Sequence, residues 1–437
     1  RFGRNRKEPV NINIFLSCTQ DANKIITMLL FLASLLLMLF DSKELLSGQT
    51  QTNDCCSAIN PSDLYDVNKL SLANNDLALK LHKTFGSNGN IFISPVSIFT
   101  ALGMLYVGAR GATAKEIRRA LSYDAAGLSD ETINHHLHKL LLSFVDSSDR
   151  YELEMANAVI SQDTHSVLKT YKDTLENYYG AAVKEVNFKE DNEKALREVN
   201  NWVRDKTHGR ITKLLESLDP DTILLLLNAA YFKGKWAQSF LPQLTRKRDF
   251  FNNGVKVVTV DTMTLQGHFF CGKFPEYETI AFKMPYIGNR VSMLVLLPFQ
   301  RNGVRAVEEE LTSTALKRIV SRLEDKYAII RFPKFKFQDS RELRRNLSSL
   351  GMKSAFTDEA DFGGINGKTN LKVSNIMHKT MVEVNEIGTV ATGATVIAIE
   401  PKMLEETFHF LVDHPFLFFI LDDTNGMILF SGRINEL

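Results

Sequence analysis

The sequence has few cysteines and almost no net charge. Only 4 of its 437 residues are cysteines, too few for the disulfide framework that holds small secreted domains together. The 52 Lys and Arg residues nearly balance the 51 Asp and Glu residues, which excludes a general attraction to nucleic acid or to anionic lipid. The fold must therefore be held by burial of its hydrophobic residues, which make up 44% of the chain.

The short motifs of common enzyme classes are also missing. The sequence contains no GxSxG, HExxH or CxxC pattern, which argues against the familiar serine hydrolases, zinc peptidases and dithiol oxidoreductases. Residues 363–369 end like a phosphate-binding loop, but the spacing is one residue short, and we interpret them as a surface loop. We therefore expect that the protein is not an enzyme and that it holds no catalytic cofactor.

Three histidines, His135, His136 and His138, raise the question of a metal site. They lie on a predicted helix that offers no convergent carboxylate or thiolate ligands. We interpret them as part of a solvated helix face and expect no metal.

The first part of the chain has the features of a leader sequence. Residues 25–40 form an apolar run without a charge, preceded by Lys24 and by a basic cluster. A membrane-spanning helix usually needs about 20 apolar residues, whereas the core of a signal peptide needs roughly 7 to 15. We expect residues 1–48 to be a signal peptide with an upstream leader, Met28 being a candidate initiator, and the mature protein to be secreted. The alternatives are a buried helix and an uncleaved signal anchor, which would attach the protein to a membrane.

The rest of the chain has the pattern of one domain. We expect residues 49–64 to be an N-terminal extension and residues 65–437 a single domain, because no repeat and no Pro/Ser/Gly-rich linker divides them. Loss of the leader leaves Cys55, Cys56 and Cys271, which we interpret as inert or loosely paired thiols. We expect a monomer that does not bind nucleic acid.

Helical patterns precede strand patterns along this domain. Thr113 and Glu116 have the spacing of a capping box that opens a short helix, and residues 195–203 have the apolar spacing of an amphipathic helix. From residue 223 onward, short runs rich in Val, Ile and Phe indicate strands, and residues 224–227 are apolar throughout, as in a strand covered on both faces. This order without strict alternation predicts an α+β fold built on large sheets.

The most unusual stretch is residues 388–399, which contain no charge and no proline and consist mainly of small and β-branched side chains. With the strand predicted at residues 371–384 it would make one strand of roughly 90 Å at about 3.3 Å per residue, far longer than ordinary strands. Gly388 and Gly393 allow the chain to bend, so we interpret the stretch as a segment that can be loop or strand. An irregular buried hairpin arm is the alternative.

Four motifs resemble those of the serpins, the serine protease inhibitors, and they occur in the order found in that family. They are residues 90–98 (NIFISPVSI), 108–113 (GARGAT), 227–236 (LNAAYFKGKW), and the C-terminal signature at 413–416 (DHPF) and 429–434 (LFSGRI). The resemblance covers about residues 65–437. It implies the secreted inhibitory type and the serpin fold, in which helices accompany three β-sheets and an exposed reactive loop can insert into the central sheet.

In serpins the segment that corresponds to residues 386–402 is the reactive loop with its proximal hinge. Inhibitory members carry small residues in the hinge, so that the loop can insert. The matching hinge positions are Glu386, Gly388, Thr389, Val390, Ala391, Thr392, Gly393 and Ala394. Val390 stands where an acidic residue is usual, which is a mild departure because alternate residues of an inserted strand point outward.

The resemblance implies suicide inhibition of a serine protease. The protease attacks the carbonyl of the bait residue, and the severed loop inserts as a new strand before water hydrolyses the acyl-enzyme. The commonest family spacing puts the reactive bond between Lys402 and Met403, and a lysine there fits trypsin-like proteases. A shift to Met403 or Leu404 is the alternative, because the segment up to residue 415 is longer than in the shortest members. Such a shift would redirect the inhibitor toward elastase-like or chymotrypsin-like enzymes.

Other matching residues concern the opening of the sheet. Ser94, Asn228 and His378 match the polar cluster beneath the central strands, and Trp236 matches the aromatic residue where insertion starts. A non-inhibitory serpin, acting as a carrier, storage protein or chaperone, is the alternative function. The small residues of the hinge argue against it, because bulky or charged residues there would block insertion.

Two further candidate sites concern a cofactor and a glycan. Lys115, Arg118 and Arg119 lie on one predicted helix, where heparin-binding serpins place basic residues, so a glycosaminoglycan is a candidate cofactor. A solvated helix face is the alternative. Asn346 begins the only obvious glycosylation sequon.

Overall fold

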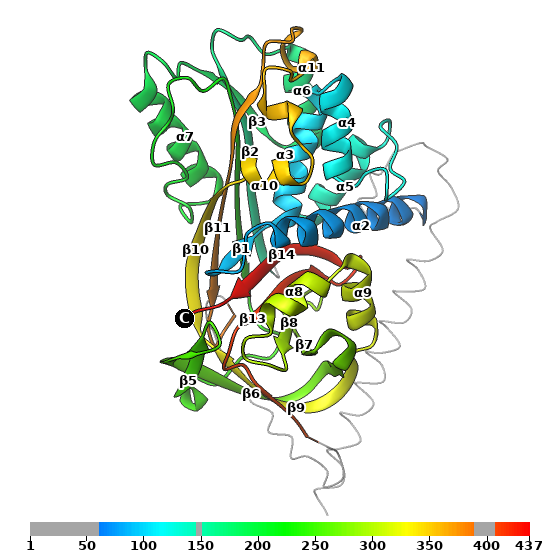
Figure 1. The fold of residues 1–437 in the computed structure, drawn as a ribbon, viewed down its shortest axis with the longest axis vertical. Coiled ribbons are helices and arrows are strands. Elements are labelled where there is room, and N and C mark those ends of the chain that lie inside the picture. Colours follow the sequence, from blue (N-terminus) through cyan, green and yellow to red (C-terminus); the bar gives the residue numbers. More distant parts are fainter. Residues whose placement is uncertain (1–60, 146–150, 389–406) are drawn as a thin grey trace, which may run out of the picture. The chain divides into compact units, whose positions relative to one another are not determined.

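The computed structural model describes residues 61–145, 151–388 and 407–437 (Figure 1). The chain divides into two units, Arg1–Ala58 and Ile59–Leu437, and every described element belongs to the second. The expected leader lies outside the described residues, as do Cys55 and Cys56. No helix within the described ranges is long and apolar enough to cross a membrane.

Helices dominate the first half of the described chain, as the sequence predicts. The α-helices are α2 (Pro61–Lys83), α3 (Pro95–Gly108), α4 (Gly111–Ala120), α5 (Ile133–Val145), α6 (Lys169–Tyr179), α7 (Asn192–Lys206), α8 (Val304–Glu310), α9 (Ser313–Ser321), α10 (Arg344–Ser349) and α11 (Gly363–Asn366). Short 3-10 turns are η2 (Pro242–Leu244), η3 (Pro275–Tyr277) and η4 (Ser354–Phe356).

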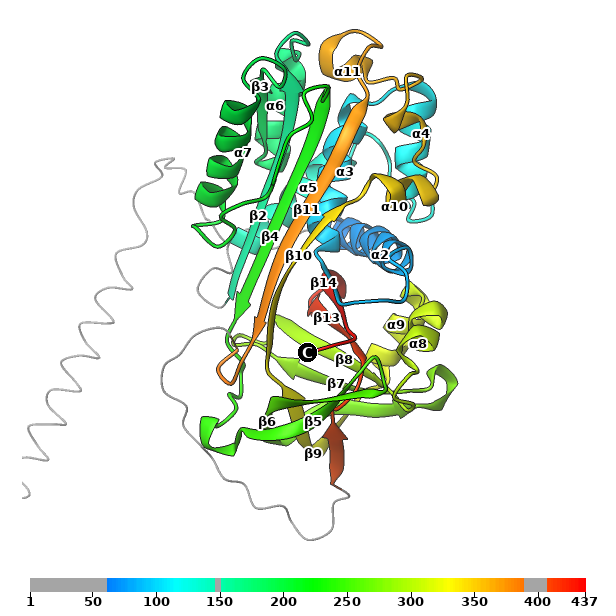
Figure 2. The same ribbon diagram turned by 60° about the vertical axis from the view of Figure 1, so that its left-hand side comes forward.

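A five-stranded sheet forms one of two sheets in the described residues. Its strands are β2 (Tyr151–Gln162), β3 (Ala182–Val186), β4 (Leu224–Gly234), β10 (Phe335–Glu342) and β11 (Val373–Val384). They lie in the order β10-β11-β4-β2-β3. Figure 2 shows β11 and β4 side by side in the middle of this sheet.

The second sheet has nine strands, in the order β1-β14-β13-β8-β7-β6-β9-β12, with β5 paired to β6 beside this path. They are β1 (Ile91–Ile93), β5 (Arg246–Asn252), β6 (Lys256–Phe274), β7 (Thr279–Pro285), β8 (Val291–Pro298), β9 (Glu324–Pro333), β12 (Phe408–Leu411), β13 (Phe416–Asp422) and β14 (Met427–Ile434). The α+β class is confirmed. We expected three sheets, and the long strand β6 joins two of them, because it pairs with β5, β9 and β7 along successive parts of its 19 residues.

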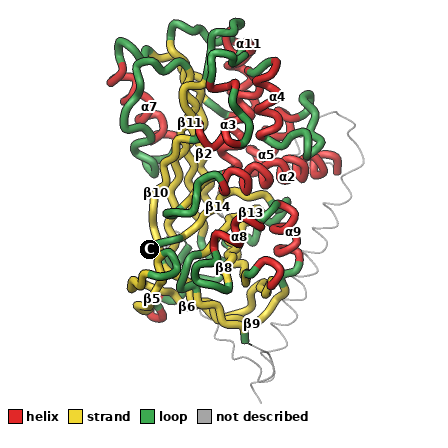
Figure 3. Tube along the Cα trace, in the orientation of Figure 1, coloured by secondary structure: helices red, strands yellow, loops and turns green. Residues whose placement is uncertain are grey.

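Part of the five-stranded sheet lies between helix α7 on one face and the helices around α3 on the other (Figures 1 and 3). On one face α7 packs through a cluster that includes Val199, Leu225 and Leu227. On the other face, Leu224 and Leu226 belong to the main core, together with α3 and the helices around it. Strand β4 is therefore covered on both faces, as its uninterrupted apolar run predicts.

Three local predictions were wrong. Helix α4 begins at Gly111, and Thr113 and Glu116 do not form a capping box: Glu116 instead accepts the backbone N–H groups of Lys353 and Ser354, each at 2.7 Å. The loop predicted at residues 363–369 begins as the single helical turn α11. The solvated histidine face is interrupted, because the helix turns His136 into the core, where it is 6% exposed.

Candidate functional site, a strand junction that can open

The candidate site is the β11–β4 junction at the centre of the five-stranded sheet. The two strands are parallel and pair from Val373↔Leu224 to Met381↔Tyr231, whereas each is antiparallel to its outer neighbour, β10 or β2. A chain that turned back after β11 and entered this junction would run antiparallel to both strands. It would replace one parallel ladder by two antiparallel ladders, and antiparallel pairing is slightly more stable per residue.

A cluster of buried polar side chains lies under this junction. The backbone N–H of Ser94, which directly precedes α3, donates to Nε2 of His378 at 3.1 Å. His378 and Asn228 are register partners on β11 and β4, and Nδ1 of His378 bonds to Oδ1 of Asn228. Asn228 donates through Nδ2 to the carbonyl oxygen of Ser97 at 2.9 Å and to Oδ1 of Asn157 on β2. Three of the four predicted sheet-opening residues are thus joined in one network across the junction.

The hydrogen bonds of His378 define a neutral imidazole. Nε2 accepts the N–H of Ser94 and so carries no proton, which leaves the ring proton on Nδ1 to be donated to Asn228. Burial, together with the nearby positive charge of Arg341, lowers the pKa of His378 to about 3. Protonation would remove the acceptor that Ser94 uses, so the network across the junction depends on the neutral ring.

The chain leaves β11 through residues 385–388, here called the exit turn, which fold over the end of β4 (Figure 2). The indole Nε1 of Trp236 donates to the carbonyl oxygen of Asn385 at 3.0 Å, and the Trp236 backbone N–H donates to that of Ile387 at 3.1 Å. The indole is buried and stacks on Tyr286, with 4.5 Å between ring centroids. Trp236, the fourth predicted sheet-opening residue, therefore fastens the exit turn to the end of β4.

Gly388 has a close backbone contact at the end of the exit turn. Its φ is +96°, in the region that favours glycine. A Cβ at this position would lie 2.6 Å from the Trp236 nitrogen and 2.7 Å from the Lys235 Cα. Glycine is therefore required here for two reasons, conformation and space, and not only for the bend that the sequence suggests.

Glu386 gives the exit turn a second attachment. Its carboxylate accepts from Nζ of Lys334 at 2.9 Å and from Oγ1 of Thr245 at 2.8 Å. Its backbone carbonyl accepts the N–H of Phe240 at 2.8 Å. Burial alone would raise the pKa of Glu386, but the hydrogen bonds from Lys334 and Thr245 outweigh burial and hold the pKa below its ordinary value. The ion pair thus ties the exit turn to Lys334, the residue that directly precedes β10.

The remaining positions of the predicted loop lie outside the described residues. These are the hinge residues Thr389, Val390, Ala391, Thr392, Gly393 and Ala394, and the reactive-bond residues Lys402 and Met403 with the alternative Leu404. Their assignments stay predictions from the sequence.

The three basic residues of the predicted glycosaminoglycan site have different surroundings on α4. Lys115 and Arg119 are exposed, whereas Arg118 is held by Asp124 at 2.5 Å and by Asp130. Arg118 therefore stabilises the segment that follows α4. Of the three predicted residues, Lys115 and Arg119 remain as candidates for binding a polyanion.

Two other candidate residues have partners or are buried: the Asn346 side chain is hydrogen-bonded, and the Cys271 thiol is buried. The Nδ2 atom of Asn346, which a glycan would modify, donates to Oγ1 of Thr84 at 2.8 Å and to its carbonyl oxygen at 3.2 Å, so attachment would require these bonds to break. Cys271 is a free, buried thiol, and burial raises its pKa to about 11. This thiol remains protonated at neutral pH, which fits an inert role.

Sequence reasoning missed several residues that the structure adds to the site, namely Asn157, Lys334, Asn385 and Tyr286. Asn157 had a detectable signal, because it is a lone amide inside the apolar stretch of residues 155–160. Lys334 had none, since its partner Glu386 is 52 residues away in the sequence. No cluster of potential metal ligands occurs in the described part of the chain.

The chain is similar to known proteins in both sequence and structure. The family model described as "Serpin (serine protease inhibitor)" matches residues 72–437. Iripin-2 of Ixodes ricinus is 40% identical over 377 residues, which cover 84% of this chain and 94% of the relative. Intracellular coagulation inhibitor 1 of Tachypleus tridentatus is 38% identical over 373 residues, which cover 84% of this chain and 89% of the relative. The crystal structure of the mouse protein-Z dependent protease inhibitor is similar with a TM-score of 0.78 and 25% identity, covering 86% of this chain and 99% of that one.

Proposed function

The chain belongs to the serpin family, and we propose that it is an irreversible suicide-substrate inhibitor of a trypsin-like serine protease. The observation that carries the proposal is the direct parallel pairing of β11 with β4. This junction can accept one more strand, and the chain that follows Gly388 is the segment with the composition to supply it.

Insertion would begin where the exit turn is fastened. Cleavage after the bait residue frees the C-terminal end of the loop, while its N-terminal end stays joined to β11. The exit turn must then release Trp236 and Lys334, and β4 must part from β11. An inserted strand gains a ladder on each side while the old ladder is lost. At roughly 1 kcal/mol per net backbone hydrogen bond, the surplus is on the order of 5–10 kcal/mol.

This surplus provides the force for trapping. The protease is attached to the severed loop as an acyl-enzyme, so it is carried along as the loop inserts. Displacement that distorts its oxyanion site slows hydrolysis of the acyl bond, since loss of one oxyanion donor costs about 10²–10³ in rate. The inhibitor is consumed in the process.

The proposed target class rests on Lys402. A lysine at the bait position fits the anionic specificity pocket of trypsin-like proteases, and we place the reactive bond between Lys402 and Met403. A bond at Met403 or Leu404 would instead select elastase-like or chymotrypsin-like enzymes.

The test is a denaturing gel of the protein incubated with trypsin, chymotrypsin or elastase. We expect a denaturant-resistant complex with trypsin, and a C-terminal fragment whose mass identifies Met403 as its first residue. Lys402→Ala should abolish the trypsin complex, and Lys353→Ala, an exposed lysine far away in the sequence, should leave it intact. Cleavage without any complex for all three proteases would favour the non-inhibitory alternative.

We also propose that the protein is secreted and processed near residue 48, as the leader pattern indicates. Expression of the full chain in cultured cells, followed by N-terminal sequencing of protein in the medium, tests this. Retention of the whole product in the cell pellet would refute it.

A further inference from the structure

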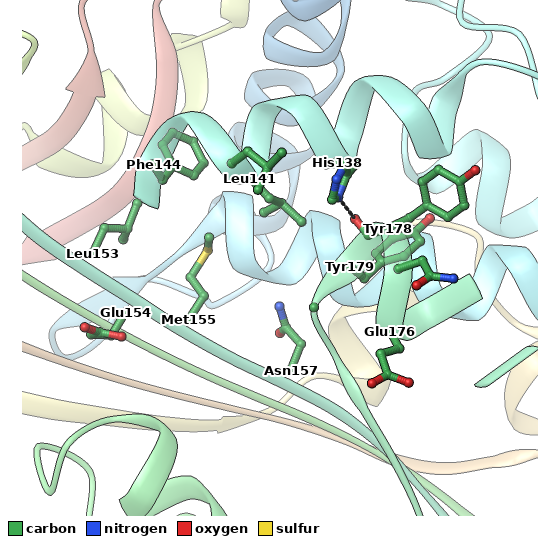
Figure 4. Close-up of a pocket in the computed structure, with 13 residues that line it drawn as sticks. His138, Leu141, Phe144, Leu153, Glu154, Met155, Asn157, Glu176, Tyr178 and Tyr179 are labelled. Atoms are coloured by element: carbon green, nitrogen blue, oxygen red, sulfur yellow. Dashed lines mark hydrogen bonds between the residues drawn. The ribbon is translucent and has the colours of Figure 1, made fainter. Parts of the chain in front are cut away.

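Some asparagines of this chain directly precede a glycine, and such pairs are chemically labile. The glycine nitrogen can attack the amide carbon of the asparagine side chain, because no side chain on glycine hinders the approach. These asparagines are Asn88, Asn253, Asn302, Asn366 and Asn425, all within the described residues. Other asparagines precede a residue with a side chain, as Asn157 on β2 does (Figure 4). The fold then decides which of the glycine nitrogens is available.

All but one of these glycine nitrogens are held by hydrogen bonds within their own turns. Each N–H donates to a carbonyl oxygen a few residues earlier: that of Gly254 to Phe251 at 2.9 Å, that of Gly303 to Gln300 at 2.9 Å, that of Gly367 to Gly363 at 2.9 Å and that of Gly426 to Asp422 at 2.7 Å. This bond must break before the nitrogen can reach the asparagine. One neutral hydrogen bond contributes roughly a factor of five, so the fold slows the reaction at these pairs.

The nitrogen of Gly89 is not held in this way. Its N–H donates to no other residue of the described chain. Asn88 is exposed, and its Oδ1 accepts one long hydrogen bond, of 3.4 Å, from the Ser87 hydroxyl. Both reacting groups are therefore available at this pair, and solvent water reaches it.

Residues 86–89, here called the 86–89 turn, lie between α2 and β1 and use their backbone differently. Their carbonyl oxygens face two buried side chains near the C-terminus: Arg433 donates to three of them and Asn435 to two, at 2.8–3.3 Å. Arg433 is fully buried and pairs with Glu308 of α8 at 2.8 Å. The turn thus directs its carbonyl groups inward to these side chains, while the Gly89 N–H has no acceptor among the described residues.

We propose that Asn88 is a site of spontaneous deamidation and isomerisation that weakens the hold of the 86–89 turn on Arg433. The Gly89 nitrogen forms a bond to Cγ of Asn88, the bond from Cγ to Nδ2 breaks, and Nδ2 leaves as ammonia with the proton of the Gly89 N–H. Water then opens the cyclic imide at either carbonyl, which gives aspartate or isoaspartate at position 88. This chemistry is independent of the proposed function.

The isoaspartate product changes the backbone around Arg433. The main chain then runs through the former side chain and is longer by one carbon atom, so the carbonyl groups of the 86–89 turn cannot all keep their places. The former carbonyl group of Asn88 becomes a carboxylate, which competes with Glu308 for the same guanidinium group. Loss of one hydrogen bond to a charged group shifts a folding equilibrium by about tenfold or more. The isomerised chain is therefore less stable than the original.

Peptide mass spectrometry of protein incubated at mildly alkaline pH measures all of the Asn-Gly pairs in one sample. In the folded protein we expect the amide of Asn88 to be lost at least about fivefold faster than that of any other pair, the factor contributed by one turn hydrogen bond. In denaturant, where the turns are absent, the rates should become similar. Equal rates in the folded protein, or the same ranking in denaturant, would overturn the assignment of Asn88.

Three variants test the consequence for stability. Asn88→Gln would have to close a larger ring and should resist the reaction, so after incubation it should keep its midpoint of unfolding in denaturant. Asn302→Gln, the matched exposed control, should gain isoaspartate at position 88 and lose stability as the wild type does. Asn88→Asp adds the charge without lengthening the backbone and should unfold like fresh wild type. Isoaspartate is quantified by labelling with protein isoaspartate methyltransferase. Unchanged stability of the isoaspartate-containing wild type would refute the link to Arg433.

Discussion

At the residue scale, a few side chains and one glycine hold the candidate site closed. Gly388 allows the exit turn to pass against the backbone of residues 234–236. His378 joins α3 to β4 through two hydrogen bonds that only its neutral ring can make. Each of these residues supports the closed sheet, and each can be tested by a single substitution.

Substitution of Gly388 by alanine should destabilise the closed protein. A positive φ costs a non-glycine residue about 1–2 kcal/mol, and here a Cβ would also collide with the backbone near Trp236. Gly426→Ala is the matched control, since Gly426 has φ +69° but nothing within 4 Å of a Cβ. Thermal unfolding should show a clearly larger drop in midpoint for Gly388→Ala than for Gly426→Ala. Equal drops would mean that the close contact does not matter.

The pH dependence of stability should carry the signature of His378. Its pKa in the fold is about 3, below the ordinary value of about 6.5, so unfolding takes up a proton between these limits. The free energy of unfolding keeps the full contribution of the neutral His378 ring above about pH 6.5. It decreases as the pH falls toward 3, by up to about 1.4 kcal/mol per pH unit. Denaturant titrations at pH 7 and pH 5 should therefore show a smaller pH effect in His378→Gln than in the wild type. The same pH effect in both proteins would contradict the neutral-ring assignment.

At the element scale, the exit turn joins β11 to the segment that we propose to insert into the sheet. The exit turn is attached both to Trp236 and to Lys334, which directly precedes β10. Both attachments must be released before β11 and β4 can separate. Local sequence patterns predict the two strands, because β4 begins with a long apolar run and β11 alternates apolar and polar residues along most of its length. They do not predict which distant side chains fasten the turn that follows β11.

The Lys334–Glu386 pair should matter more than an exposed pair nearby. The Glu386 side chain is 12% exposed, so Lys334→Met leaves a mostly buried carboxylate without its partner, at a cost of about 2 kcal/mol. Lys336→Met breaks a pair with Glu383 whose side chains are 61% and 32% exposed and should cost under about 1 kcal/mol. Denaturant unfolding of the two variants provides the comparison. A larger loss for Lys336→Met would refute the attachment.

The hinge prediction has its own test at the element scale. Thr389→Arg would introduce a long charged side chain into the segment that is expected to insert first, and burial of an unpaired charge is strongly unfavourable. The variant should be cleaved by trypsin at a normal rate but should form at least tenfold less denaturant-resistant complex. Thr424→Arg, in the exposed turn between β13 and β14, serves as control. Undiminished trapping by Thr389→Arg would show that this segment does not insert.

At the scale of the whole molecule, the sequence predicts the class of the fold and the general place of the site. The apolar runs predict β4, β11 and the α+β architecture, and the small residues after Gly388 indicate a segment with two conformations. The joining of two expected sheets by β6 was not predicted, because pairing partners depend on tertiary packing. The capping-box prediction failed for a similar reason: Glu116 bonds to residues 353 and 354, which are remote in sequence. Local patterns predict elements, while the contacts that hold this site closed link distant segments.

The most direct test of the account is a reversible lock across the β11–β4 junction. Ala229 and Lys379 are register partners on the two parallel strands, and neighbouring strands lie about 4.8 Å apart, within the range that a disulfide spans. We expect the oxidised double variant Ala229→Cys with Lys379→Cys to be cleaved by trypsin without trapping it, and reduction to restore the trapped complex. Both single variants should trap in either redox state. Trapping by the fully oxidised double variant at the wild-type level would contradict the claim that inhibition requires this junction to open.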